Sequence, residues 1–167
     1  MFSEIIDFSN CCEDNKKIDF LYNIFKIDFI DNNVYLNETI FIDPKTYDKN
    51  DGKEKIFWHV ITKKDRGQRK FDSQRASRIK WIKTIILNYS NIKIKMFYYY
   101  EDTRKIRLYL WAYDNDFVVI LQKLGNSSSY LVTSFYIDNQ KKKDKFQNKY
   151  EDYINKVDSR LNNCEWF

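Results

Sequence analysis

Several residue types and motifs are scarce in this sequence, and each scarcity narrows the class of protein. The 167 residues include one proline, three glycines and no Gly/Pro/Ser-rich linker, so we expect a single domain of ordinary size over 1–167. No apolar run approaches the roughly 20 residues that a membrane span needs. The first residues, MFSEIIDFSN, lack a basic region ahead of an apolar stretch. We therefore expect no membrane insertion and no export by the usual route.

Cysteine, histidine and the common catalytic motifs are also scarce. Cys11, Cys12 and Cys164 are an odd number of cysteines, and none belongs to a CxxC pair. This pattern predicts neither a disulfide framework nor a metal site, and it suits the reducing cytoplasm. The chain has no GxxxxGKS/T, GxGxxG, GxSxG or HExxH motif, so we expect no cofactor and no P-loop or zinc chemistry. His59 is the one histidine, and any histidine chemistry depends on it alone.

Aromatic and charged residues, by contrast, are plentiful. Aromatics make up 18% of the chain, which excludes a protein that stays disordered. The net charge of +5 is unevenly spread, because residues 1–52 carry a net −6 and residues 53–95 a net +10. The basic block holds four arginines within thirteen residues: Arg66, Arg69, Arg75 and Arg78. A local basic field attracts polyanions such as nucleic acid, and the alternative is a solvated loop and helix face without a ligand.

The hydrophobic patterns predict an α+β fold, in which an antiparallel four- to five-stranded sheet is packed by N-terminal and central helices and followed by a C-terminal helix. Apolar residues at helical spacing predict helices over 14–29, 74–89 and 141–161. Segments rich in β-branched and aromatic residues predict strands over 34–36, 39–42, 55–62, 92–100, 105–113, 117–124 and 129–138. The last four strands are joined by connections short enough for hairpins. Residues 63–72 are predicted as a loop around Gly67.

His59 lies in the middle of the predicted strand KIFWHVIT. Alternation along that strand places the imidazole on the side opposite the core, where we expect neighbouring cations to lower its pKa and favour the neutral form. A neutral imidazole can accept the proton of a ribose 2′-OH. A histidine at a sheet surface can equally be structural, and both interpretations stay open.

The predicted last strand, SYLVTSFYID, supplies further candidates. Alternation directs one set of side chains toward the core: Leu131, Thr133, Phe135 and Ile137. Ser134 and Tyr136 then share the open face with His59. There a hydroxyl can bind a phosphoryl oxygen, and a tyrosine can stack on a base.

Arg75 and Arg78 begin the predicted helix over 74–89, which Asp72 is suited to cap. Both arginines project near the isoleucine stripe of that helix, so each must reach a carboxylate or emerge at the edge of the packed layer. The preceding loop carries the other RNA- or phosphate-binding candidates: Lys63, Arg66 and Arg69. If the helix arginines emerge beside this loop, the group forms a phosphate clamp.

The strand with FWHVIT, the arginine-bearing loop, the helix RASRIKWIKTIILN and the late strand YLVTSFYID together resemble a group of nuclease domains. These are phage- and mobile-element-associated nucleases of the barnase/EndoU/colicin/RelE-like superfamily. The resemblance covers about residues 53–150, whereas residues 1–52 match nothing we can name. On this basis residues 1–52 form an acidic helical and extended part, 53–138 a basic nuclease-like core and 139–167 the C-terminal helix.

The resemblance implies a metal-free RNase site on a small sheet. The strand histidine of the family would be His59, its basic helix-start residues Arg75 and Arg78, and its late-strand hydroxyl Thr133 or Ser134. It also implies a toxin or phage-conflict effector that cuts tRNA or mRNA and is held by an immunity or antitoxin protein. The chain departs from the family's frequent pair of acid–base groups, because it has no second histidine.

These observations predict a cytoplasmic, metal-independent endoribonuclease that forms a 2′,3′-cyclic phosphate. His59 would deprotonate the 2′-OH, Arg75 and Arg78 would neutralise the phosphorane, and Tyr136 or a lysine would protonate the leaving oxygen. Two alternatives are a non-catalytic RNA-binding module and an immunity- or antitoxin-like protein whose acidic first third covers a basic toxin.

Overall fold

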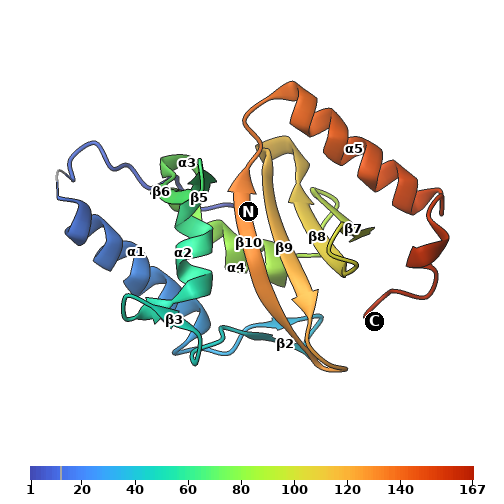
Figure 1. Cartoon of the computed structure of the whole chain (residues 1–167), viewed down its shortest axis with the longest axis horizontal. Coiled ribbons are helices and arrows are strands. Elements are labelled where there is room, and N and C mark those ends of the chain that lie inside the picture. The colour runs from blue at the N-terminus through green and yellow to red at the C-terminus, as the bar shows by residue number, and fades with distance from the viewer. Residues whose placement is uncertain (12) are drawn as a thin grey trace.

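The computed structural model describes residues 1–11 and 13–167, which form an α+β fold (Figure 1). The helices are α1 (Asp14–Phe29), α2 (Lys55–Ile61), α3 (Ser73–Ala76), α4 (Ile79–Leu87) and α5 (Gln140–Ile154). The strands of the main sheet are β1 (Tyr35–Leu36), β2 (Ile40–Asp43), β7 (Ile94–Tyr100), β8 (Ile106–Ala112), β9 (Phe117–Lys123) and β10 (Ser128–Tyr136). Two small hairpins lie outside that sheet: β3 (Lys49–Asn50) with β4 (Lys53–Glu54), and β5 (Thr62–Asp65) with β6 (Gln68–Phe71).

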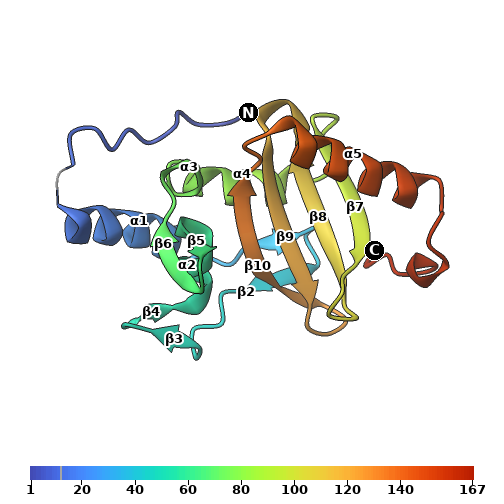
Figure 2. The same ribbon diagram turned by 45° about the horizontal axis from the view of Figure 1, so that its top comes forward.

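The main sheet is curled and mixed, and in the described residues it has six strands in the order β1-β2-β10-β9-β8-β7 (Figure 2). Strands β7 to β10 form the predicted antiparallel meander, with every boundary within two residues of its expected place. Strand β2 extends the sheet on the other side of β10 and pairs with it in parallel, with Phe41 opposite Ser128. The prediction of a purely antiparallel sheet of four to five strands was therefore wrong. Pairing between segments so far apart in the chain leaves no local pattern to detect.

Helices cover both faces of the sheet. On one face α1, α2 and α4 enclose a core that includes Leu110, Leu121 and the fully buried Ile85 of α4. On the other face, Phe146 of α5 packs against Trp111, with 6.0 Å between the ring centroids. Successive residues of β8 and β9 belong to opposite faces, as the two-residue period of a strand requires.

The acidic first third contributes to the same hydrophobic core. Helix α1, which has the predicted bounds, buries Leu21, Phe25 and Phe29. Strands β1 and β2 add Leu36 and Ile42, and all five side chains belong to one buried cluster with α4 and the sheet. Removing this third would therefore take away part of the core, so its deletion cannot separate partner binding from folding.

The segment KIFWHVIT forms helix α2 and not the predicted strand. Four of its side chains are buried: Ile56, Phe57, Val60 and Ile61. Their spacing, two adjacent residues repeated four positions later, is that of one helix face. The β-branched and aromatic composition favoured the strand, but a short apolar run does not distinguish a buried strand from a buried helix. As a result Trp58 and His59 both lie on the half-buried side of a helix.

The basic segment after α2 is a hairpin and not the predicted loop. Strands β5 and β6 are joined by Arg66 and Gly67, whose φ angles are 48° and 83°. Two successive positive φ values give the tight turn whose twist matches a two-residue hairpin. All residues of β6 are exposed, so the hairpin presents its cations to solvent.

The predicted helices over 74–89 and 141–161 are both interrupted. The first divides at Ser77 and Arg78 into α3 and α4. Asp72 caps α3 as predicted, because its carboxylate accepts hydrogen bonds from two backbone N–H groups. The second helix, α5, ends at Ile154, and Lys156 has a φ of 54° that a helix does not allow. None of the helices in the described residues is both long enough and apolar enough to cross a membrane.

The core position of α4 gives a first testable prediction. Ile85→Ala is expected to lower the free energy of unfolding by about 2–5 kcal/mol, because it leaves a cavity in a close-packed core. Leu87, in the same helix, is 54% exposed, so Leu87→Ala is expected to cost less than about 1 kcal/mol. Urea unfolding followed by circular dichroism compares the two variants. Equal losses would contradict the packing of α4 on the sheet.

Candidate functional site

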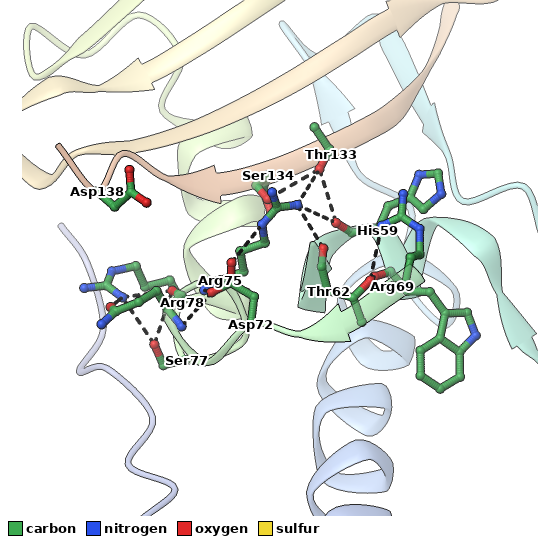
Figure 3. A network of polar contacts seen from close by, with 12 residues as sticks. His59, Thr62, Arg69, Asp72, Arg75, Ser77, Arg78, Thr133, Ser134 and Asp138 are labelled. Atoms are coloured by element: carbon green, nitrogen blue, oxygen red, sulfur yellow. Dashed lines mark hydrogen bonds and ion pairs between the residues drawn. The ribbon is translucent and has the colours of Figure 1, made fainter. Parts of the chain in front are cut away.

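The candidate site lies where the C-terminal end of α2 meets α3 and β10 (Figure 3). Strand β10 has a register shift between Leu131 and Thr133, which leaves Val132 as a bulge. A bulge adds one residue to one strand and so reverses the alternation beyond it. Thr133 therefore reaches α2, and its Oγ1 donates a hydrogen bond to the backbone oxygen of His59 at 3.2 Å.

The guanidinium of Arg75 joins all three elements. Its Nη1 donates to the backbone oxygens of His59 at 3.2 Å and Thr62 at 3.0 Å, and to Oγ1 of Thr133 at 3.3 Å. Its Nε lies 3.4 Å from a carboxylate oxygen of Asp72. The last carbonyls of a helix lack partners within the helix, and a cation there also opposes the helix dipole. Arg75 thus caps the C-terminus of α2 and ties it to β10.

The imidazole of His59 is half-buried beside this cap. Its Nδ1 lies 3.4 Å from the backbone oxygen of Val132 in the bulge. Burial lowers the pKa of His59, and the positive charges of Arg69 and Arg75 lower it further, against the opposing effects of Val132 and Asp48. A lowered pKa agrees with the prediction, although burial contributes more to the lowering than the nearby cations do. The neutral imidazole is the favoured form at pH 7.

Arg69 of β6 is the cation that the structure leaves free beside His59. Its Nη1 donates to Oγ1 of Thr62 at 3.2 Å, and this hydroxyl donates in turn to the backbone oxygen of Trp58. No ion pair of Arg69 occurs within residues 1–11 and 13–167. The rest of its guanidinium can therefore face a ligand.

Ser134 and Tyr136 do not share a face with His59, contrary to prediction. The bulge turns Ser134 into the core, where it is 0% exposed. Tyr136 packs against Arg78, whose guanidinium carbon lies 4.4 Å from the ring centroid. Thr133, which was predicted to face the core, supplies the hydroxyl that reaches the site. The strand alternation was wrong because Val, Thr and Ser suit either face and give no sign of a bulge.

Arg78 belongs to a separate group that points away from His59 (Figure 3). Its Nη1 donates to the backbone and side-chain oxygens of Gln74 and to Oγ of Ser77. It is 8% exposed, and in the described part of the chain it forms no ion pair with a carboxylate. Two alternatives were expected for the helix arginines. Arg75 does reach a carboxylate, whereas Arg78 neither reaches one nor emerges.

The structure therefore divides the predicted site residues into three sets. His59, Arg69, Arg75 and Thr133 lie together. Lys63 and Arg66 are exposed along the hairpin. Of the remaining three, Arg78 and Tyr136 lie apart from His59, whereas Ser134 is buried next to Thr133 with its side chain in the core.

Sequence reasoning missed two contributors to the site. Thr62 provides both an acceptor for Arg75 and a hydroxyl for Arg69. The helical spacing of KIFWHVI was the signal that would have placed it at the end of a helix. Val132 contributes only its backbone oxygen, for which a side-chain pattern carries no signal.

Comparison of the chain with protein-family models, curated protein sequences and solved structures found no match. The resemblance to nucleases therefore stays a prediction. Among the described residues, no group of three or more His, Cys, Asp or Glu side chains is placed to hold a metal ion. Cys11 and Cys164 are free thiols, and Cys12 lies outside the described residues.

Because the chain has one histidine, its titration can be followed directly by NMR. We expect the imidazole of His59 to titrate below its ordinary pKa of 6.5. Arg69→Gln should raise the midpoint, because it removes a nearby positive charge. Lys26→Gln removes an exposed charge that has no resolved influence on His59 and should leave the midpoint unchanged. A wild-type midpoint at or above 6.5 would contradict the described environment.

The cap on α2 gives a third prediction. Arg75→Met is expected to lower the free energy of unfolding by about 1–3 kcal/mol, because the carbonyl of Thr62 loses its side-chain donor and that of His59 loses one of its two. Arg75→Lys should recover only part of this loss, since one ammonium cannot reproduce the planar guanidinium. Arg66→Gln, at the exposed turn, should stay within about 0.5 kcal/mol of wild type. If urea unfolding showed Arg75→Met to be as stable as wild type, Arg75 would be free for a ligand and not a cap.

Proposed function

We propose that this protein is a metal-independent endoribonuclease, with His59 as the proton acceptor and the β5–β6 hairpin as the RNA-binding element. The proposal rests on one observation: the only histidine lies, half-buried and with a lowered pKa, at the base of a basic hairpin. The exposed cations of that hairpin are Lys63, Lys64, Arg66, Arg69 and Lys70. Such a group attracts a phosphate backbone, and a neutral imidazole beside it accepts a proton.

In the proposed reaction His59 takes the proton of a ribose 2′-OH, and the 2′-oxygen attacks the adjacent phosphorus. The bond between phosphorus and the 5′-oxygen breaks. One fragment then ends in a 2′,3′-cyclic phosphate and the other in a 5′-hydroxyl. The leaving oxygen takes a proton from a hairpin lysine, because Tyr136, the other candidate acid, packs against Arg78.

Arg69 takes the electrostatic role that the sequence suggested for Arg75 and Arg78. The one hydrogen bond found for its side chain in the described residues goes to Thr62, which leaves guanidinium nitrogens for bidentate contact with phosphate. Arg75 acts as a positioning residue, because its Nη1 holds the backbone oxygens of His59 and Thr62.

A second candidate is RNA binding without cleavage. It is favoured by the isolation of His59 from the other acid–base candidates, since Ser134 is buried and Tyr136 packs elsewhere. Both candidates use the same cations, so binding alone does not distinguish them. A role as a toxin or phage-conflict effector held by an immunity protein follows from the resemblance alone.

The test is incubation of the purified protein with total tRNA and a structured mRNA in EDTA. We expect discrete fragments with cyclic-phosphate ends, and a rate that persists below pH 6.5 because the base stays neutral there. His59→Ala should lower the rate at least about 100-fold, whereas Lys26→Ala should not change it.

A paired charge experiment tests the hairpin as the RNA-binding element, which both candidates require. Lys63→Gln combined with Lys64→Gln should weaken RNA binding and its salt dependence. Lys26→Gln combined with Lys93→Gln removes the same charge from other exposed positions and serves as the control. Salt-sensitive binding of RNA that stays intact would favour the non-catalytic candidate. The absence of both binding and cleavage would overturn the proposal.

A further inference from the structure

A pocket of about 330 Å³ opens next to the candidate site. Its lining includes Asn50, Asp51, Trp58, Thr62, Arg69 and Phe71, from the two small hairpins and α2. The volume lies near the lower end of the roughly 300–1,000 Å³ typical of small-molecule sites. Arg69 lines this pocket and also lowers the pKa of His59, so the pocket and the candidate site share one cation, although His59 is not among the lining residues.

The aromatic walls of the pocket are held in place before any ligand binds. The indole Nε1 of Trp58 donates to the backbone oxygen of Asn50 at 2.8 Å. The same ring packs edge-on against Phe57, with 5.3 Å between centroids. Phe71 is 36% exposed, packs edge-on against Phe8 and has the ammonium of Lys17 at 5.2 Å from its ring centroid. A fixed aromatic ring offers a stacking surface without the entropic cost of ordering it.

The pocket is polar at two ends, and these ends have opposite charge. Arg69 contacts Thr62, which bonds the backbone of Trp58, so the cation lies toward the backbone end of that residue. Asn50 and the neighbouring Asp51 lie at the Nε1 edge of the indole. The lining therefore offers a cation near the backbone end of Trp58, an acidic residue near its Nε1 edge and an aromatic wall between them.

We propose that this pocket binds the base of an RNA nucleotide, with the phosphate of that nucleotide against Arg69 and the edge of the base toward Asp51. A carboxylate accepts hydrogen bonds from exocyclic amino groups, so adenine and cytosine bind more tightly than uracil, which has none. An apolar side chain of a partner protein would instead leave Arg69 and Asp51 without partners, which is costly. The inference rests on the proposed function in taking RNA as the ligand.

The test uses mononucleotides, which contain no bond for the enzyme to cleave. Isothermal titration calorimetry in EDTA, with AMP, CMP, UMP and ribose 5-phosphate, is expected to show binding of AMP and CMP. UMP should bind at least about 5-fold more weakly, the lower limit for one lost base-edge contact. Ribose 5-phosphate should bind weakest. Asp51→Asn should reduce the difference between CMP and UMP.

Aromatic variants identify the pocket as the binding site. Trp58→Ala should weaken AMP binding about 5- to 150-fold, the range found when a stacking ring is removed. Trp58→Phe keeps a ring, so AMP should still bind while its quenching of tryptophan fluorescence is lost. Phe71→Ala alters a more exposed ring of the same pocket and should also weaken AMP binding. It replaces Trp58→Ala as the test if that variant does not fold. Trp166→Phe is the matched control and should change neither affinity nor quenching.

Two results would overturn the inference: equal binding of ribose 5-phosphate and AMP, or no nucleotide binding at millimolar concentration. The outcome is independent of the cleavage assay. If AMP bound but RNA stayed intact, the base-binding pocket would be supported and the endoribonuclease activity contradicted. If RNA were cleaved but no mononucleotide bound, the activity would be supported and the pocket contradicted.

Discussion

The geometry around His59 depends on one guanidinium. Helix α2 has seven residues, too few to be stable without tertiary contacts. Arg75 holds the free carbonyls at its end and contacts Thr133 of β10 at the same time. The backbone oxygen of His59 accepts hydrogen bonds from both of these residues. The position of the imidazole is therefore set through the backbone, and its side chain stays available for chemistry.

The spacing of apolar residues along the chain predicted those helices and strands whose neighbours in the fold are also near in the sequence. The apolar spacing around Phe25 gave α1 at its observed bounds, and the short connections gave the β7 to β10 meander. Asp72 was identified as a cap because an N-cap side chain bonds to residues only two or three positions away. The parallel pairing of Phe41 with Ser128 was missed because nothing near either residue in the sequence records it.

The candidate site was predicted only in part, for two local reasons. The strand assigned to residues 55–62 placed His59 on a sheet, whereas this segment forms the helix α2 and buries Ile56, Phe57, Val60 and Ile61 along one face. The bulge at Val132 then exchanged the faces of Thr133 and Ser134. The lowering of the pKa of His59 by nearby cations was predicted correctly, because the cations are close to His59 in the sequence whether the segment is a strand or a helix. Which arginine is free and which is structural depends on single hydrogen bonds, and no pattern in the sequence carries that information.

The parallel pairing of β2 with β10 also determines the order in which the chain can complete its core. Helix α1 and strands β1 and β2 leave the ribosome before the rest of the sheet, and the two strands carry the core residues Leu36, Ile40 and Ile42. Strand β10, the partner of β2, is synthesised only after the helices α2 to α4, the two small hairpins and three more strands of the main sheet. Non-local pairing of this kind slows folding, because the entropy cost of closing the long loop between the paired segments comes before any stabilisation from their contact. The core residues of the first third therefore stay incompletely covered until β10, the last strand of the sheet to be made, pairs with β2.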